Sequence, residues 1–139
     1  MVDACKEELG DVRYRRCSYI LEENQRVLDA AKALKTNDLK KLGKLLYTSH
    51  EGQSKKYEIS CSELDFLVEL SKEEPEILGA RMMGGGFGGC TINLIHKDTV
   101  DLFVAKASKA YKEKFGIELS HFKTVPSSGT CKSNHNHEA

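Results

Sequence analysis

The sequence predicts an α+β fold in which helices pack on one face of a small antiparallel sheet. Three segments in the first 75 residues have the apolar spacing of amphipathic helices. Two short strand-like runs then flank a glycine-rich connection, and a further helix precedes a last strand-like run. With 139 residues, of which 40% are hydrophobic, the chain suits one domain with a core. We expect a single domain over residues 1–139, in which residues 126–139 form a tail without periodicity.

The first expected helix begins near Cys17 and runs for about 20 residues. Its apolar positions recur every three or four residues and should form its buried face: Cys17, Ile20, Leu21, Val27, Leu28, Ala31 and Leu34. The letters TND end this helix, and the carboxylate of Asp38 can cap a second one by accepting from amides of its first turn. The apolar face of the second helix carries Leu39, Leu42 and Leu46, and His50 takes the next position on that face.

The third expected helix opens at the segment YEISCSEL, in which Ser60 and Glu63 have the spacing of a capping box. Ile59 and Leu64 are placed to form a hydrophobic staple across its first turn. Pro75 ends this helix, since proline cannot continue the hydrogen-bonding pattern.

Two strands are expected next, GARMM over residues 79–83 and CTINLI over residues 90–95, and the letters GGGFGG between them favour an antiparallel pair. Asp98 is expected to cap a fourth helix, and Gly116 stands where a left-handed C-terminal cap belongs. The run IELSHFKTV, residues 117–125, is expected to be the last strand.

Composition argues against several classes of protein. Twenty-one basic and 21 acidic residues give a net charge of zero, so we expect no broad surface for nucleic acid or an anionic membrane. No apolar run approaches the roughly 20 residues that cross a bilayer, and the charged amino end does not resemble a signal peptide. The five cysteines are widely spread and form no CxxC pair, which is typical of reduced thiols in a cytoplasmic protein.

The glycine run is the segment most indicative of chemistry. Gly84, Gly85, Gly86, Gly88 and Gly89 remove the side chains from a short arc, so that another body can approach the backbone closely. Phosphate-binding loops use this property, yet the run lacks the GxxxxGK[ST] pattern and leads into a strand rather than a helix. The local pattern therefore leaves a ligand-proximal loop and a tightly bent connector as alternatives.

Other polar residues have structural interpretations beside functional ones. His50 lies on an apolar helix face, where a histidine is more typical of a hydrogen-bonded core residue than of a base or a ligand. Arg81 precedes the glycine run and could support a site there, although a salt bridge at the sheet edge explains it equally well. His135, His137 and Glu138 in the tail could bind a metal adventitiously, and we assign no metal ligand in this chain.

Four segments together resemble the galactokinases of the GHMP kinase family. GARMMGGGFGGCTINLI looks like the third signature motif of that family, in its galactokinase version. YRRCSYILEENQRV, LGKLLYTSHEG and YEISCSELDFLVELS are similar to the helices that come before that motif in galactokinases. The resemblance covers about residues 7 to 130 in the same order, which makes it much more specific than the glycine run alone.

The resemblance implies the ferredoxin-like C-terminal domain of a kinase that uses ATP and Mg²⁺ to phosphorylate galactose at its anomeric hydroxyl. The loop from Gly84 to Gly89, with Phe87 anchoring it into the domain, would line the nucleotide and phosphate cleft, supported by Arg81 and His50. The signatures for galactose, for the nucleotide loop and for catalysis do not occur in this sequence. The resemblance thus implies that an N-terminal kinase domain holds the ATP, the Mg²⁺ and the catalytic residues, and that this chain alone is inactive.

Three other functions stay open, and one of them is a free-standing binding module without a kinase partner. Some galactokinase-like proteins have lost catalysis and act as sugar sensors and transcriptional co-inducers. Sister GHMP kinases act on other sugars or small alcohols.

Overall fold

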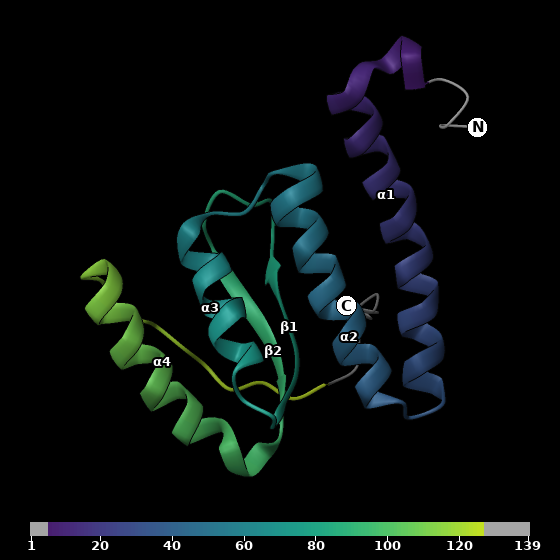
Figure 1. Ribbon diagram of the computed structural model, residues 1–139. Coiled ribbons are helices and arrows are strands. Elements are labelled where there is room, and N and C mark those ends of the chain that lie inside the picture. Colours follow the sequence, from purple (N-terminus) through teal and green to yellow (C-terminus); the bar gives the residue numbers. More distant parts are fainter. Residues whose placement is uncertain (1–5, 127–139) are drawn as a thin grey trace, which may run out of the picture.

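The computed structural model describes residues 6–126, which form helices around one β-hairpin (Figure 1). The helices are α1 (Lys6–Lys35), α2 (Leu39–Glu51), the π-helical turn η2 (Gly52–Tyr57), α3 (Ser62–Lys72), the 3-10 turn η3 (Lys97–Thr99) and α4 (Val100–Phe115). The strands are β1 (Ile77–Met83) and β2 (Cys90–Ile95), which pair antiparallel with Met83 opposite Cys90. Within the described residues, no helix is long and apolar enough to cross a bilayer.

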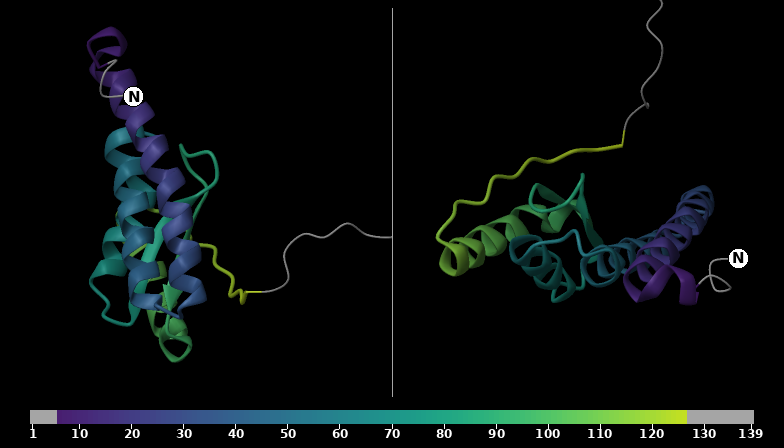
Figure 2. Two further views of the ribbon diagram at one scale, coloured as in Figure 1. Left: turned by 90° about the vertical axis from the view of Figure 1, so that its right-hand side faces the viewer. Right: turned by 90° about the horizontal axis from the view of Figure 1, so that it is seen from above.

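The helices lie in a row beside the hairpin. Figures 1 and 2 show α2 and α3 next to the strands, α1 on the outer side of α2, and α4 beyond α3. The predicted α+β class, with helices on a small antiparallel sheet, is confirmed. One buried cluster, formed by Leu70, Ile77, Phe103 and Ala107, joins α3, β1 and α4.

Helix α2 and strand β1 touch backbone to backbone at two glycines. A Cβ atom on Gly43 would lie 1.9 Å from the carbonyl oxygen of Leu78, and one on Gly79 would lie 2.4 Å from the Cα of Gly43. Real Cβ atoms do not approach other atoms so closely, so this packing requires glycine at both positions. The contact sets β1 directly against α2.

The first helix differs from its prediction in extent and in orientation. It begins at Lys6 rather than near Cys17, and Gly10 interrupts it with φ 71° and ψ 162°. The face expected to be buried is exposed: Cys17, Ile20, Leu21, Val27, Leu28, Ala31 and Leu34. Tyr19 and Ala33 are buried instead, and α1 meets α2 through Glu23, which accepts from the Ser49 hydroxyl.

The predicted helix caps have mixed outcomes. Asp38 caps α2 as expected and accepts from the amide of Lys41 at 3.0 Å. The capping box at Ser60 is wrong, because Cys61 is the N-cap of α3 and the Ser60 hydroxyl donates to Asp65. Asp98 is also not a cap: it lies within η3, which leads into α4 without a side-chain cap.

Of the two predictions for the carboxyl-terminal part of the domain, a cap at Gly116 and a strand after it, one is confirmed. Gly116 is the left-handed cap of α4, with φ 70°, as expected. The predicted strand over residues 117–125 is wrong, since these residues form no strand. Leu119 packs against the core cluster, while Phe122 and Val125 are each 80% exposed. Alternating residues alone do not produce a strand, because a strand also needs its backbone hydrogen-bonded to a neighbour, and residues 117–125 pair with neither β1 nor β2.

Candidate functional site

The glycine-rich segment forms an irregular loop between β1 and β2, near the point where η2 leads into α3 (Figure 1). Gly84, Gly86, Gly88 and Gly89 have positive φ angles between 86° and 134°, and Phe87 is left-handed with φ 58°. Such a run of positive φ angles is accessible to glycine at little cost and to other residues only with strain. The backbone conformation of the loop therefore requires glycine at four of its five glycine positions.

The middle of the loop is fixed to the segment before α3. The Phe87 amide donates to the Ile59 carbonyl at 2.7 Å. A Cβ on Gly86 would lie 2.2 Å from that same carbonyl oxygen, so no side chain fits there. The Phe87 ring is 78% exposed. The expected anchoring by the Phe87 side chain is thus wrong, and the anchor is its backbone amide.

Gly85 differs from its neighbours. Its φ angle is not positive, and a Cβ on this residue would meet no atom within 4 Å. Neither the conformation nor the packing of the described chain therefore requires glycine at position 85.

His50 is buried in the core and hydrogen-bonded through both ring nitrogens. Its Nδ1 accepts from the Met82 amide at 3.2 Å, and its Nε2 lies 3.1 Å from the Asp65 carboxylate. Burial lowers the pKa of His50, and this effect exceeds the opposite influence of Asp65. Neutral His50 thus reaches the glycine loop only indirectly, through the backbone of β1.

Arg81 points towards the interface of α1 and α2. Its guanidinium donates to the Ser49 hydroxyl at 3.2 Å and lies 4.0 Å from the Glu23 carboxylate. These contacts match the interpretation of Arg81 as a partner in a structural ion pair. The positive charge of Arg81 is thus directed at Ser49 and Glu23 and not at the glycine loop.

A partly buried polar cluster therefore joins α1, α2 and β1, and the sequence pattern did not indicate it. The Ser49 hydroxyl donates to Glu23 at 2.7 Å, and Arg26 also pairs with Glu23. Burial would raise the pKa of Glu23, but the hydrogen bonds from Arg26 and Ser49 outweigh it and hold that pKa below its ordinary value. Burial and the neighbouring Glu23 raise the pKa of Tyr19 to about 12.

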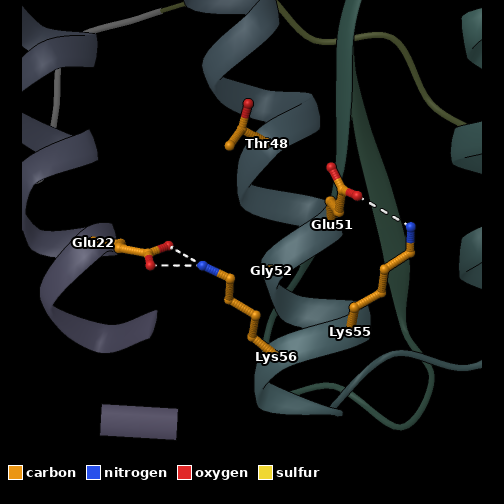
Figure 3. A pocket seen from close by; sticks show the side chains of 6 residues that line it. All are labelled: Glu22, Thr48, Glu51, Gly52, Lys55 and Lys56. Carbon is orange, nitrogen blue, oxygen red and sulfur yellow. Dashed lines mark hydrogen bonds and ion pairs between the residues drawn. The ribbon is translucent and has the colours of Figure 1, made fainter. Parts of the chain in front are cut away.

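A cavity of about 260 Å³ lies between α1 and the junction of α2 with η2 (Figure 3). Its lining residues are Glu22, Thr48, Glu51, Gly52, Lys55 and Lys56. The Lys56 ammonium bonds Glu22 at 2.6 Å, and the Lys55 ammonium bonds Glu51 at 3.0 Å. Because each of these lysines is already paired with a carboxylate, the described lining offers no free positive charge with which to attract an anion.

Residues 6–126 bring no three histidine, cysteine or acidic side chains together in a metal-binding arrangement. His135, His137 and Glu138, which the sequence offers as an adventitious metal site, lie outside the described residues. Sequence patterns did not indicate that Asp65 is a centre of hydrogen bonds. Its carboxylate accepts from the Ser54 and Ser60 hydroxyls and also contacts His50.

Comparisons with known proteins agree on one family. Residues 30–113 match the family described as GHMP kinases C terminal. A galactokinase of Thermotoga neapolitana is 43% identical over 126 residues, which are 91% of this chain and 36% of that protein. A galactokinase of Clostridium perfringens is 44% identical over 118 residues, which are 84% of this chain and 30% of that protein. The chain thus spans about a third of the length of the curated relatives it matches.

Solved structures give the same result. The crystal structure of Lactococcus lactis galactokinase complexed with galactose matches with a TM-score of 0.79 and 37% identity, over 84% of this chain and 30% of that one. The structure of L. major mevalonate kinase in complex with R-mevalonate matches with a TM-score of 0.54 and 31% identity, over 62% of this chain and 26% of that one.

Proposed function

Because this chain belongs to the GHMP kinase family, we propose that it is the C-terminal domain of a galactokinase, which transfers a phosphoryl group from ATP to the anomeric hydroxyl of galactose. The similarity to galactokinases over most of the chain supports this assignment. The product would be galactose 1-phosphate. The three unpaired cysteines among the described residues support a reducing, cytoplasmic location.

We further propose that this domain works against an N-terminal kinase domain in a longer protein. The relatives are about three times as long as the matched region, which supports such a partner. The exposed apolar face of α1 offers a surface for it, with Leu21, Val27, Leu28 and Leu34 each more than half exposed. The catalytic residues would belong to the N-terminal domain.

The role proposed for the glycine loop follows from its bare backbone. Phosphoryl transfer depends on positioning and on electrostatic stabilisation, and Mg²⁺ neutralises charge on the transferred phosphate when it is bound. A loop in which only Phe87 carries a side chain lets a phosphate-binding segment approach its glycines closely, and the loop amides present partial positive charge. In this proposal Gly84 to Gly89 line the nucleotide and phosphate cleft, while ATP and Mg²⁺ are held mainly by the N-terminal domain.

Gly85 carries this proposal. The described chain itself gives no reason for glycine there, so a requirement for glycine would come from a body outside this domain. We expect Gly85→Ala in the full-length protein to lower kcat/KM for galactose phosphorylation roughly 10- to 100-fold, since small misplacements of reacting groups have effects of this size. Its thermal stability should stay unchanged. The isolated 139-residue chain should show no turnover.

Gly116→Ala is the matched control, because Gly116 is an open position remote in sequence from the loop, with φ 70°. It should lower the stability through backbone strain and leave the turnover of the folded enzyme unchanged. Full activity of Gly85→Ala would contradict the proposal, because the loop would then be a connector without a close neighbour.

A further inference from the structure

Asp65 connects segments that meet at the start of α3. Its Oδ2 accepts from the Ser54 hydroxyl of η2 at 2.9 Å. Its Oδ1 accepts from the Ser60 hydroxyl at 2.6 Å and lies 3.1 Å from Nε2 of His50 in α2. One carboxylate thereby holds η2, α2 and the segment before α3 in a fixed relation.

His50 connects Asp65 to strand β1. Since Nδ1 accepts from the Met82 amide, the ring proton of the neutral form lies on Nε2 and is directed at Asp65. His50 is only 4% exposed, and its burial lowers its pKa. Asp65, Glu69 and Lys72 are the charged groups that influence it, and all three belong to α3. If the His50 ring were protonated, the N–H on its Nδ1 and the amide N–H of Met82 would point at each other.

Asp65 is connected through other residues to Met82, just before the glycine loop, and to Phe87 within it. Through His50 the carboxylate holds Met82, which lies two residues before Gly84. Through Ser60 it holds the residue next to Ile59, whose carbonyl binds the Phe87 amide in the middle of the loop. The loop is therefore tied before its first residue and at its fourth.

We propose that Asp65 and His50 are positioning residues that set the place of the glycine loop at both of these points. They act through the Met82 and Phe87 amides and touch no reacting group. This inference rests on the proposed function for its catalytic meaning, while the positioning itself concerns only this chain.

The first test is amide hydrogen exchange in the 139-residue chain. The reference amide is that of Ala107, which is 2% exposed, lies in the middle of α4 and belongs to the core cluster, so its exchange reports the stability of the core. Asp65→Ala should raise the exchange rates of the Met82 and Phe87 amides at least tenfold more than that of Ala107. An equal rise at all three amides would overturn the inference, because the carboxylate would then stabilise the domain as a whole.

Asp65→Asn is the matched conservative variant. Its single side-chain oxygen can still accept from Ser60 and His50, while its NH₂ group can donate to the Ser54 hydroxyl. We therefore expect Asp65→Asn to restore most of the protection that Asp65→Ala loses. If Asp65→Ala does not fold, Ser60→Ala removes only the connection to Ile59 and should raise exchange at Phe87 but not at Met82. Unchanged exchange at Phe87 in Ser60→Ala would refute that connection.

Two variants of His50 separate its two bonds. The side-chain amide of asparagine ends near the position of Nδ1 and that of glutamine near the position of Nε2. We expect His50→Asn to retain protection of the Met82 amide and His50→Gln to lose it. The imidazole nitrogen shifts of the wild-type chain at neutral pH should report a neutral ring with its proton on Nε2, and a proton on Nδ1 would refute the arrangement.

The second test uses turnover in the full-length protein. Asp65→Ala should lower kcat roughly tenfold or more and leave KM for galactose nearly unchanged, because it displaces the loop without removing a sugar contact. Asp65→Asn should recover most of that loss. Altered exchange with unaltered kcat would overturn the catalytic part of the inference. Failure of the proposed function would instead appear as a fully active Gly85→Ala enzyme.

Discussion

The replacement of Gly86 by alanine tests the anchoring of the glycine loop most directly. Gly86 has φ 92°, and a Cβ built on it would lie 2.2 Å from the Ile59 carbonyl oxygen and 2.7 Å from the Ile59 Cβ. Ordinary van der Waals contact begins at 3.4 Å, so the loop and the segment before α3 must move apart. That movement breaks the bond of 2.7 Å between the Phe87 amide and the Ile59 carbonyl.

The cost has two parts. A left-handed backbone costs an alanine about 1–2 kcal/mol relative to glycine, and the lost hydrogen bond costs about 1 kcal/mol. We therefore expect Gly86→Ala to lower the free energy of unfolding by about 2–3 kcal/mol. Urea denaturation of the 139-residue chain, followed by circular dichroism, measures this difference from the transition midpoint.

Gly85→Ala is the control in the same loop, since its Cβ meets no atom within 4 Å and its φ is not positive. Its stability should stay within about 0.5 kcal/mol of the wild type. Equal stability of the two variants would refute the reasoning, because it would show that the contact of Gly86 with Ile59 does not hold the loop.

Two pH predictions concern the polar cluster. Because the pKa of Tyr19 is raised to about 12 from 10.0, the folded chain keeps a proton that the unfolded chain loses. Stability should therefore fall as the pH rises from about 10 to about 12, and Tyr19→Phe should reduce this fall in urea denaturation; an unchanged slope would contradict the assignment. The pKa of Glu23 is lowered from 4.5, so its stabilisation is present above pH 4.5 and is lost as the pH falls through the folded pKa. Glu23→Gln should flatten this acid-side loss in thermal melts, and an equally steep loss would count against it.

Local signals predicted the elements that depend on local physics. The strand CTINLI occupies residues 90–95 as expected, because the glycines mark its start and a largely apolar run follows them up to Ile95. Asp38 caps α2, since a carboxylate at this position finds its amide donor within one turn. The left-handed cap at Gly116 has the same local origin.

Properties that depend on distant partners were not predictable in this way. Apolar spacing correctly indicated a helix at α1, but it could not show that Tyr19 and Glu23 would face α2 while Val27 and Leu28 remain exposed. Ser60 has the right spacing for a capping box, yet its hydroxyl donates to Asp65 instead. The alternating residues at 117–125 likewise could not show whether this segment would pair with the sheet, and it does not.

The candidate site shows the same division. The glycine run identified the loop, but only coordinates distinguish Gly86, which packing requires, from Gly85, which it does not. Asp65 was missed because its partners Ser54, Ser60 and His50 come from three separate segments. A single carboxylate in the first turn of a helix gives no sequence signal of such a role.

The contact between Gly43 and Gly79 has a mechanical consequence. No layer of side chains separates α2 from β1 there, so no rotamer change can absorb a displacement of one against the other. A displacement of β1 at this point would therefore have to move α2 together with it. The hydrogen bond from the Met82 amide to His50 joins the same two elements, so sliding of α2 along β1 would also have to break this bond.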